Sequence, residues 1–230
     1  MERTPNIFEL SIPVLALDVV IFTIYQGALC AVSVVGSNIV AKGKSVLPGG
    51  VVTNGESLEE AFDRILLQTT GLKGIYKEQL YTFGNPGRDS RGHVVSVVYY
   101  ALVDYLSLAS QIDISRILTT PIHMISTDTF AYDHAEIITY AKKRLEWKLE
   151  YTNVAQNILH ESFTLTALQS IYEVIFERVL DKRNFRKKIL ALGLIQETGE
   201  TDKSSSRRPA RLYSFVDTEL KMLEKREITM

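Results

Sequence analysis

The residues best suited to chemistry in this sequence form a Gly-rich turn and the acidic stretch that follows it. Gly49 and Gly50 close a loop ahead of a predicted helix. Backbone amides of a Gly-rich turn that opens onto a helix can hold a phosphate group, and carboxylates placed close together can hold a divalent cation. Two simpler interpretations stay open, in which the glycines only make a tight turn and the carboxylates only stabilise the helix start and face solvent. The carboxylates of this stretch are Glu56, Glu59, Glu60 and Asp63.

The stretch from residue 50 to residue 72 resembles the Nudix signature, which is typical of hydrolases that cleave nucleoside diphosphates linked to another group. In that family, glutamates along the helix hold the metal ions that activate water. This chain has Ile65, Gln68 and Thr69 where the family has three of them, and an amide or a hydroxyl carries no charge to offset a dication. The resemblance therefore implies a retained scaffold with no catalytic residue and no metal site, so we expect no enzyme. The residues in register are Gly50, Glu56, Arg64, Leu66, Gly71 and Leu72.

A second stretch, residues 83–96, resembles the segment that follows this signature in the ADP-ribose branch of the family and in its regulator offshoot. Its guanidinium groups could pair with a phosphate or sugar ligand, because their donors match phosphate oxygens bidentately. The alternative is a salt bridge with Asp89 on a solvated loop. Together with the turn, these similarities predict an effector-binding set of Gly49, Gly50, Glu56, Arg64, Arg88 and Arg91.

Residues 130–138 also resemble the regulator offshoot, in which such a run opens the last helix of the Nudix domain. Asp133 is a suitable N-cap, and Glu136 lies where a capping box would place it. We expect a structural role for His134 rather than contact with a ligand.

The elements that must position these residues alternate between strands and helices. Apolar, β-branched runs at 16–25 and 28–35 are separated by Gln26 and Gly27, which predicts a hairpin, and residues 36–50 are expected to be a loop. A capping box of Ser57 with Glu60 predicts the start of a helix that Gly71 ends. Further strands are predicted at 80–83 and 94–103, and a further helix at about 133–149.

The second half of the chain changes to two helices and a terminal hairpin. Thr166 with Gln169 predicts a capping box for the first helix, and Asp181 is expected to cap the second, at 182–192. Short strands are predicted at 194–198 and 211–215, joined by a polar loop. Helix, turn, helix and hairpin together predict a winged helix-turn-helix, with residues 152–162 as the linker before it.

The second helix and the hairpin loop form a strongly basic region. Residues 178–211 contain ten basic and four acidic side chains. On a helical wheel, Phe185 and Ile189 lie on one side and the basic residues on the other, while Leu190 falls near the basic side. A charge run can be no more than a solvated face, but a basic recognition helix beside a basic wing predicts contact with DNA. The predicted DNA-binding residues are Lys182, Arg183, Asn184, Arg186, Lys187, Lys188, Arg207, Arg208 and Arg211.

Residues 163–173, 180–188 and 208–213 resemble the C-terminal domain of Nudix-related transcriptional regulators, and the similarity extends over about residues 14 to 216. It implies a Nudix-type α/β/α sandwich at 1–151 that senses ADP-ribose or a sugar and dimerises, and a winged helix-turn-helix domain at 152–230 that binds a double-stranded operator. It further implies a homodimer, a role as a repressor in NAD metabolism or sugar use, and no required cofactor.

Composition bounds the remaining possibilities. Hydrophobic residues make up 46% and charged residues 23%, as in an ordinary globular protein. The apolar stretch at 12–25 is too short to span a bilayer and no basic leader precedes it, so we expect a cytoplasmic protein without membrane contact. Cys30 cannot form a disulfide within the chain and is expected to be buried. Two alternatives stay open: an ADP-ribose or ADP-sugar pyrophosphatase with an accessory nucleic-acid-binding domain, and a DNA-binding module without regulation.

Overall fold

A mixed sheet between two layers of helices forms the N-terminal part of the protein. The computed structural model describes residues 12–112, 116–202, 209–217 and 219–223. The sheet has the strand order β3-β2-β1-β6-β5, with β4 paired to β1 and β7 paired to β2. Only the β1–β6 pair is parallel among these pairs of described strands. The strands are β1 (Val14–Tyr25), β2 (Ala28–Val35), β3 (Ser45–Val46), β4 (Gly49–Val51), β5 (Tyr76–Phe83), β6 (Val94–Leu102) and β7 (Leu118–Pro121).

The predicted hairpin is confirmed as β1 and β2. Gln26 and Gly27 connect the strands with φ angles of 49° and 75°. Two successive residues with positive φ match the right-handed twist of the strands they join, which is why such turns are favoured in two-residue hairpins. The segment predicted as a loop at 36–50 also contains β3 and the first residues of β4, which were too short to show a strand period.

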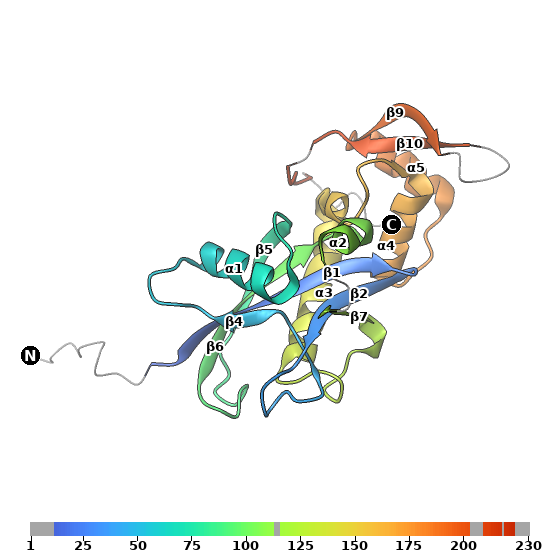
Figure 1. The fold of residues 1–230 in the computed structure, drawn as a ribbon. Coiled ribbons are helices and arrows are strands. Elements are labelled where there is room, and N and C mark those ends of the chain that lie inside the picture. Colours follow the sequence, from blue (N-terminus) through green and yellow to red (C-terminus); the bar gives the residue numbers. More distant parts are fainter. Residues whose placement is uncertain (1–11, 113–115, 203–208, 218, 224–230) are drawn as a thin grey trace, which may run out of the picture.

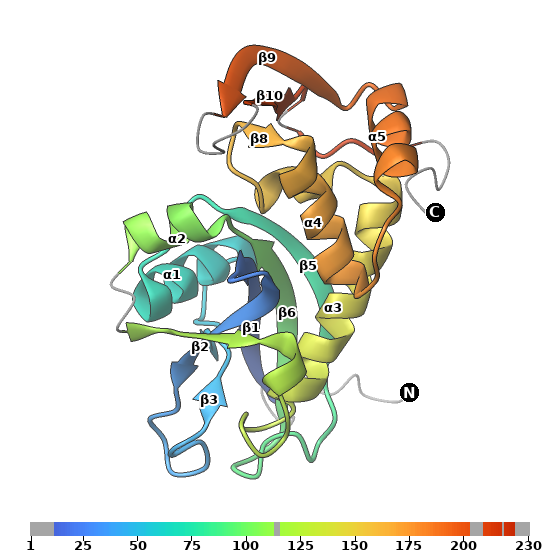
Figure 2. The same ribbon diagram turned by 90° about the vertical axis from the view of Figure 1, so that its right-hand side faces the viewer.

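Helices cover both faces of the sheet (Figures 1 and 2). α1 (Leu58–Thr70) and α2 (Tyr105–Gln111) lie on one face, and α3 (His134–Tyr151) lies on the other. The predicted capping box is present, since Ser57 accepts a hydrogen bond from the Glu60 amide and Glu60 accepts one from the Ser57 amide. On the other side, α3 buries Leu145 and Leu149 against the sheet and the C-terminal helices. The α/β/α layering predicted from the sequence is therefore confirmed.

The C-terminal part is a helix-turn-helix followed by a hairpin. Its small sheet has the order β8-β10-β9 and stacks beside its two helices. The hairpin strands are longer than predicted, so the wing loop between them is shorter. The elements are β8 (Phe163–Thr164), α4 (Leu165–Phe176), α5 (Lys182–Ala191), β9 (Ile195–Asp202) and β10 (Ala210–Phe215).

The capping box predicted from Thr166 and Gln169 is wrong. The N-cap of α4 is Thr164, whose side chain accepts a hydrogen bond from the Ala167 amide at 3.1 Å. Gln169 is occupied elsewhere, because its amide donates to the Leu180 carbonyl at 2.9 Å. Thr164 pairs with β10 in extended conformation, so the helix begins two residues before the position that the local pattern indicated.

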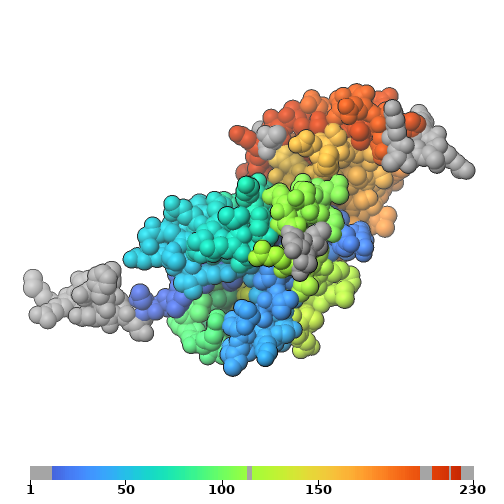
Figure 3. All heavy atoms as spheres, in the orientation of Figure 1, coloured from blue at the N-terminus to red at the C-terminus, as the bar shows by residue number. Residues whose placement is uncertain are grey.

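The segment between the two parts is packed rather than open. A short 3-10 helix, η4 (Val154–Asn157), follows α3, and its residues Val154 and Ala155 are buried. Asn153 binds the backbone of Glu219 and Lys221. In the space-filling view the C-terminal residues, drawn in orange and red, lie directly against the N-terminal part (Figure 3). The linker predicted at 152–162 therefore belongs to a continuous core.

Cys30 is buried, as expected. Within the described residues, no helix combines the length and the apolar character needed to cross a membrane.

Candidate functional site

A cavity of about 740 Å³ opens at one end of the sheet, which is large enough for a nucleotide-sized ligand. Strand β1, the loop after β2, strand β4, the loop after β5 and the start of α3 all contribute to its walls. Four of the six residues predicted to bind an effector line it, namely Gly49, Gly50, Arg88 and Arg91. The sequence did not indicate the other polar residues of the wall, which include Asp18, Asn38, Asp89, Tyr132 and His134.

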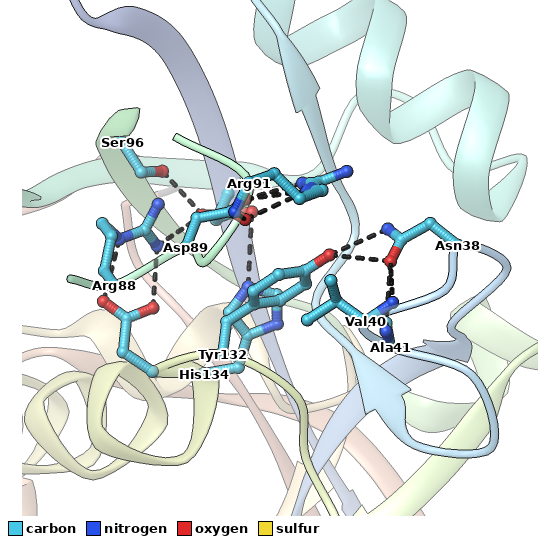
Figure 4. A network of polar contacts seen from close by, with 11 residues as sticks. Asn38, Val40, Ala41, Arg88, Asp89, Arg91, Ser96, Tyr132 and His134 are labelled. Atoms are coloured by element: carbon cyan, nitrogen blue, oxygen red, sulfur yellow. Dashed lines mark hydrogen bonds and ion pairs between the residues drawn. The ribbon is translucent and has the colours of Figure 1, made fainter. Parts of the chain in front are cut away.

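Arg88 lines the cavity with a largely buried side chain and lies at the centre of a charged network (Figure 4). Its guanidinium donates to both carboxylate oxygens of Asp133, at 2.9 and 2.8 Å, and to Asp18 Oδ2 at 3.3 Å. Ser96 donates to the same Asp18 oxygen at 2.6 Å. Burial by itself would lower the pKa of Arg88, but the Asp133 hydrogen bonds and the Asp18 charge raise it above its usual value. Arg88 is therefore charged, and its donors are directed at carboxylates.

Asp133 is the N-cap residue of α3, as predicted, but the side-chain hydrogen bonds of a capping box are absent. Asp133 makes no side-chain hydrogen bond to the first turn of α3, because Arg88 takes both of its oxygens. The capping box with Glu136 is therefore absent. The start of α3 is instead bonded to Arg88, a residue of the cavity lining.

His134 fixes the loop that carries the two glycines. Its Nδ1 accepts a hydrogen bond from the Leu47 amide at 2.9 Å. Burial lowers the pKa of the imidazole, so the ring is neutral and its proton is on Nε2, which lies 3.8 Å from Asp18 Oδ1. The structural role predicted for His134 agrees with these contacts, although the residue also lines the cavity.

Arg91 differs from Arg88 in exposure, since 52% of its side chain is accessible. Nε and Nη2 donate to Asp89 at 3.0 and 2.6 Å, so the salt bridge considered from the sequence is present. The guanidinium carbon lies 5.5 Å from the centre of the Tyr132 ring. Nη1 takes no part in the Asp89 contacts, so one edge of this guanidinium remains for an anion in the cavity.

Tyr132 and Asn38 also line the cavity. Tyr132 has a φ of 55°, a conformation that is strained for an aromatic residue and therefore requires support from its surroundings. The support comes from Asn38, whose amide nitrogen donates to the Tyr132 hydroxyl at 2.8 Å. Asn38 Oδ1 also accepts the amides of Val40 and Ala41, which fixes the loop after β2.

Glu56 and Arg64 lie outside the cavity lining. Arg64 donates to Glu56 Oε1 at 2.8 Å and to the Val51 carbonyl at 3.0 Å, so the pair ties the start of α1 to β4. Hydrogen bonds from Thr53 and then from Arg64 lower the pKa of Glu56. These contacts give Glu56 and Arg64 a structural role. For Glu56 this agrees with the simpler interpretation of the sequence, in which the carboxylates stabilise the start of the helix.

At the three positions where Nudix hydrolases have glutamates, this chain has one buried apolar side chain and two side chains hydrogen-bonded within α1. Ile65 is 1% exposed, and its Cγ1 lies 3.3 Å from where a side chain at Gly50 would begin. Thr69 donates to the Ile65 carbonyl at 2.6 Å, and Gln68 accepts from Arg64 at 3.4 Å. Over the described ranges of the chain, no three His, Cys, Asp or Glu side chains are grouped so that they could hold a metal ion.

Gly49 is required by the packing of the turn. A Cβ at this position would lie 2.2 Å from Asp18 Oδ1 and 3.0 Å from the Leu17 carbonyl. The close approach lets β4 pair with β1 directly beside the charged network. The tight-turn interpretation of Gly49 therefore holds, and the residue lines the cavity as well.

The second candidate site is the outer face of α5. Asp181 caps the helix as predicted, accepting the Asn184 amide at 2.8 Å. Phe185 and Ile189 are buried, while Leu190 is 47% exposed. This agrees with the predicted division between a packed and a basic face. The exposed polar residues are Lys182, Arg183, Asn184 and Lys187, and Lys188 is partly exposed.

The remaining residues predicted to bind DNA have different surroundings. Arg186 turns back toward α4, where its Nη2 lies 3.4 Å from the Thr166 hydroxyl. Arg211 donates to Glu197 Oε1 at 2.7 Å across the hairpin, and this hydrogen bond raises its pKa. Arg207 and Arg208 lie outside the described residues. Contact of the whole set with DNA stays a prediction.

Comparison with known proteins shows similarity over both parts of the chain. Residues 155–215 match the model of the NrtR DNA-binding winged helix domain. The ADPR-responsive transcriptional repressor NtrR of Acinetobacter baylyi is 35% identical over 208 residues, which is 89% of this chain and 82% of that protein.

Solved structures give the same result. The crystal structure of Shewanella oneidensis NrtR complexed with a 27mer DNA has a TM-score of 0.78 and 34% identity, covering 87% of this chain and 93% of that one. The Nudix domain of the same protein, complexed with ADP-ribose, has a TM-score of 0.53 and 31% identity, covering 62% of this chain and 94% of that one. A single alignment therefore covers most of both parts of the chain.

Proposed function

The chain belongs to the NrtR family of Nudix-related transcriptional regulators, and on this premise we propose that it is a DNA-binding repressor whose Nudix domain binds ADP-ribose as its effector. Its fold is a Nudix-type α/β/α sandwich with a C-terminal winged helix domain. The observation that carries the proposal is a cavity of nucleotide size that Thr69 lines. Gln68 and Thr69 stand where Nudix hydrolases have their paired metal-binding glutamates, and Ile65 stands at the place of the first glutamate. A scaffold that keeps the pocket but lacks the metal-binding carboxylates is suited to binding a small molecule without cleaving it.

Arg91 is the residue that we expect to contact the diphosphate of ADP-ribose directly. Its side chain lines the cavity, is half exposed and keeps one edge of its guanidinium outside the contacts with Asp89. Backbone groups at Gly49 and Gly50 complete the wall on the other side. Arg88 has an indirect role, because its hydrogen bonds hold Asp133 at the start of α3. Glu56 and Arg64 have a structural role at the start of α1.

The N-terminal part, residues 1–151, is the sensing and dimerisation domain in this proposal, and residues 152–230 form the DNA-binding domain. A homodimer would present two copies of α5 to successive major grooves of a two-fold related operator. As a repressor the protein acts in the compartment that holds this DNA, which we take to be the cytoplasm.

Catalytic inactivity belongs to the same proposal. Cleavage of a diphosphate in this fold depends on metal ions held by several carboxylates. Ile65 is buried, and the side chains of Gln68 and Thr69 are hydrogen-bonded to α1 itself. The pyrophosphatase alternative would need other ligands from outside the signature.

One experiment tests binding and inactivity together. We expect ADP-ribose to raise the melting temperature of the full chain and to be recovered intact after incubation with magnesium, because ligand binding stabilises the folded state. Arg91→Gln should weaken binding by about tenfold, the effect of losing one charge-assisted hydrogen bond. Lys73→Gln, an exposed cation outside the cavity lining, is the matched control. Magnesium-dependent release of AMP, abolished by Glu56→Gln, would establish the enzyme instead.

A further inference from the structure

We propose that α3 transmits ligand binding in the cavity to the helix-turn-helix through the ion pair between Lys142 and Glu177. The inference rests on the proposed function, because it names how the cavity regulates DNA binding. α3 is a continuous helix of 18 residues that begins at the cavity wall and continues past α4 (Figure 2). Both ends of the proposed connection are therefore on one rigid element.

The first end of the connection is the start of α3. Asp133 holds Arg88 at 2.8 and 2.9 Å, and His134 holds the Leu47 amide at 2.9 Å. Asp133 makes no cap bond, and these contacts join the start of the helix to the cavity wall. An anionic ligand in the cavity attracts Arg88 and repels Asp18 and Asp133, so the binding of a diphosphate acts directly on the first turn of α3.

The second end is Lys142, about 14 Å further along the helix axis at 1.5 Å per residue. Its ammonium lies 3.1 Å from Glu177 Oε1 and 3.0 Å from Glu146 Oε1, and its side chain is only 17% exposed. Glu177 is the C-cap of α4 and has a φ of 53°. It is the first residue of the turn between the two helices of the helix-turn-helix, so Lys142 contacts the DNA-binding domain at its bend.

The turn itself is held as one unit with both helices. Glu173 Oε1 accepts the Leu180 amide at 2.9 Å, and Gln169 donates to the Leu180 carbonyl at 2.9 Å. Asp181 then caps α5 directly after this residue. A displacement of Glu177 therefore moves α4 and α5 together, and α5 carries the basic face. A rigid helix that two sites both contact is a physical route for coupling between them.

The test compares charge variants of the full chain. Lys142→Glu places three carboxylates together, and Glu177→Lys added to it restores an opposite-charge pair. The control is Lys143→Met, because Lys143 is exposed and lies over the Trp147 ring of the same helix. Two quantities are measured for each protein: the operator Kd with and without saturating ADP-ribose, and the ADP-ribose Kd of the protein without DNA.

In the wild-type protein we expect ADP-ribose to raise the operator Kd about tenfold. Lys142→Glu should reduce this ratio by roughly threefold or more while leaving the ADP-ribose Kd within about twofold. The double variant should restore the ratio, which a merely destabilised protein would not do. If the wild type responds and Lys142→Glu responds equally, the proposed connection is overturned. If the wild type does not respond to ADP-ribose at all, the proposed function fails, and the connection with it.

Discussion

Replacing Arg88 with methionine is expected to destabilise the protein by about 3–5 kcal/mol, the usual effect of breaking a buried ion pair on one side. Arg88 is 5% exposed, and the side chains of its partners Asp18 and Asp133 are 11% and 16% exposed. Methionine fills much of the same volume without a charge. Two carboxylates would then lie close together in a partly dry site, where their repulsion is poorly screened.

Urea unfolding, followed by far-UV circular dichroism and by the fluorescence of Trp147 on α3, measures this effect. Arg211→Met is the matched control, because Arg211 also pairs with one carboxylate but both side chains are about half exposed or more. We expect the control to lose no more than about 1 kcal/mol. Equal unfolding midpoints for the two variants would show that the Arg88 network does not hold the cavity together.

The second large effect is expected at the basic face of α5. Arg183→Ala and Asn184→Ala should each cost about 1–3 kcal/mol of operator binding and relax the sequence preference, as residues at the start of a recognition helix do when they contact bases. Lys187→Ala should weaken binding to all sequences alike and reduce the slope of log K against log salt by about 1. All three side chains are exposed on the outer face of α5.

Fluorescence anisotropy with operator and scrambled duplexes at several salt concentrations measures these differences. Lys221→Ala is the control, because this exposed lysine is not part of α5 and pairs with Asp217. If Arg183→Ala and Lys221→Ala bind the operator equally well, α5 is not the recognition helix. An equal loss for Asn184→Ala on both duplexes would assign that residue to the phosphate backbone.

Local patterns were sufficient for much of the fold. The turn at Gln26 and Gly27, the capping box of Ser57 and the cap at Asp181 all depend on residues within a few positions of each other. Their outcome is set by backbone preference and short hydrogen bonds, which sequence spacing describes well. By contrast, α2 has seven residues and β7 has four, so neither is long enough to show a period.

The candidate site could be predicted only in part, because its contacts join distant segments. Arg88 is separated from Asp133 by 45 positions and from Asp18 by 70. Nothing in the local sequence shows that Asp133 will bind Arg88 instead of capping α3. Asp18 gave one available signal, as a charged residue inside an apolar strand, where such a group requires a partner. The strained backbone of Tyr132 gave no signal, since positive φ is rare outside Gly, Asn and Asp.

The altered Nudix signature contributes to the packing of the N-terminal domain through Ile65. Ile65 is buried against Gly50, so the place of a family glutamate is part of the hydrophobic core on the α1 face of the sheet. A carboxylate there would be separated from water without a metal to pair with. An isoleucine at this position of the signature therefore contributes to the core of the scaffold that carries the cavity.

The central claim is that a ligand in the cavity controls DNA binding by α5. The measurement that tests it most directly is the affinity of the full-length protein for DNA from upstream of its own gene, titrated by anisotropy at moderate salt with and without saturating ADP-ribose. We expect sequence-selective binding whose Kd rises about tenfold when ADP-ribose is present. The same Kd in both titrations, or no preference for this DNA over a scrambled duplex, would contradict the claim.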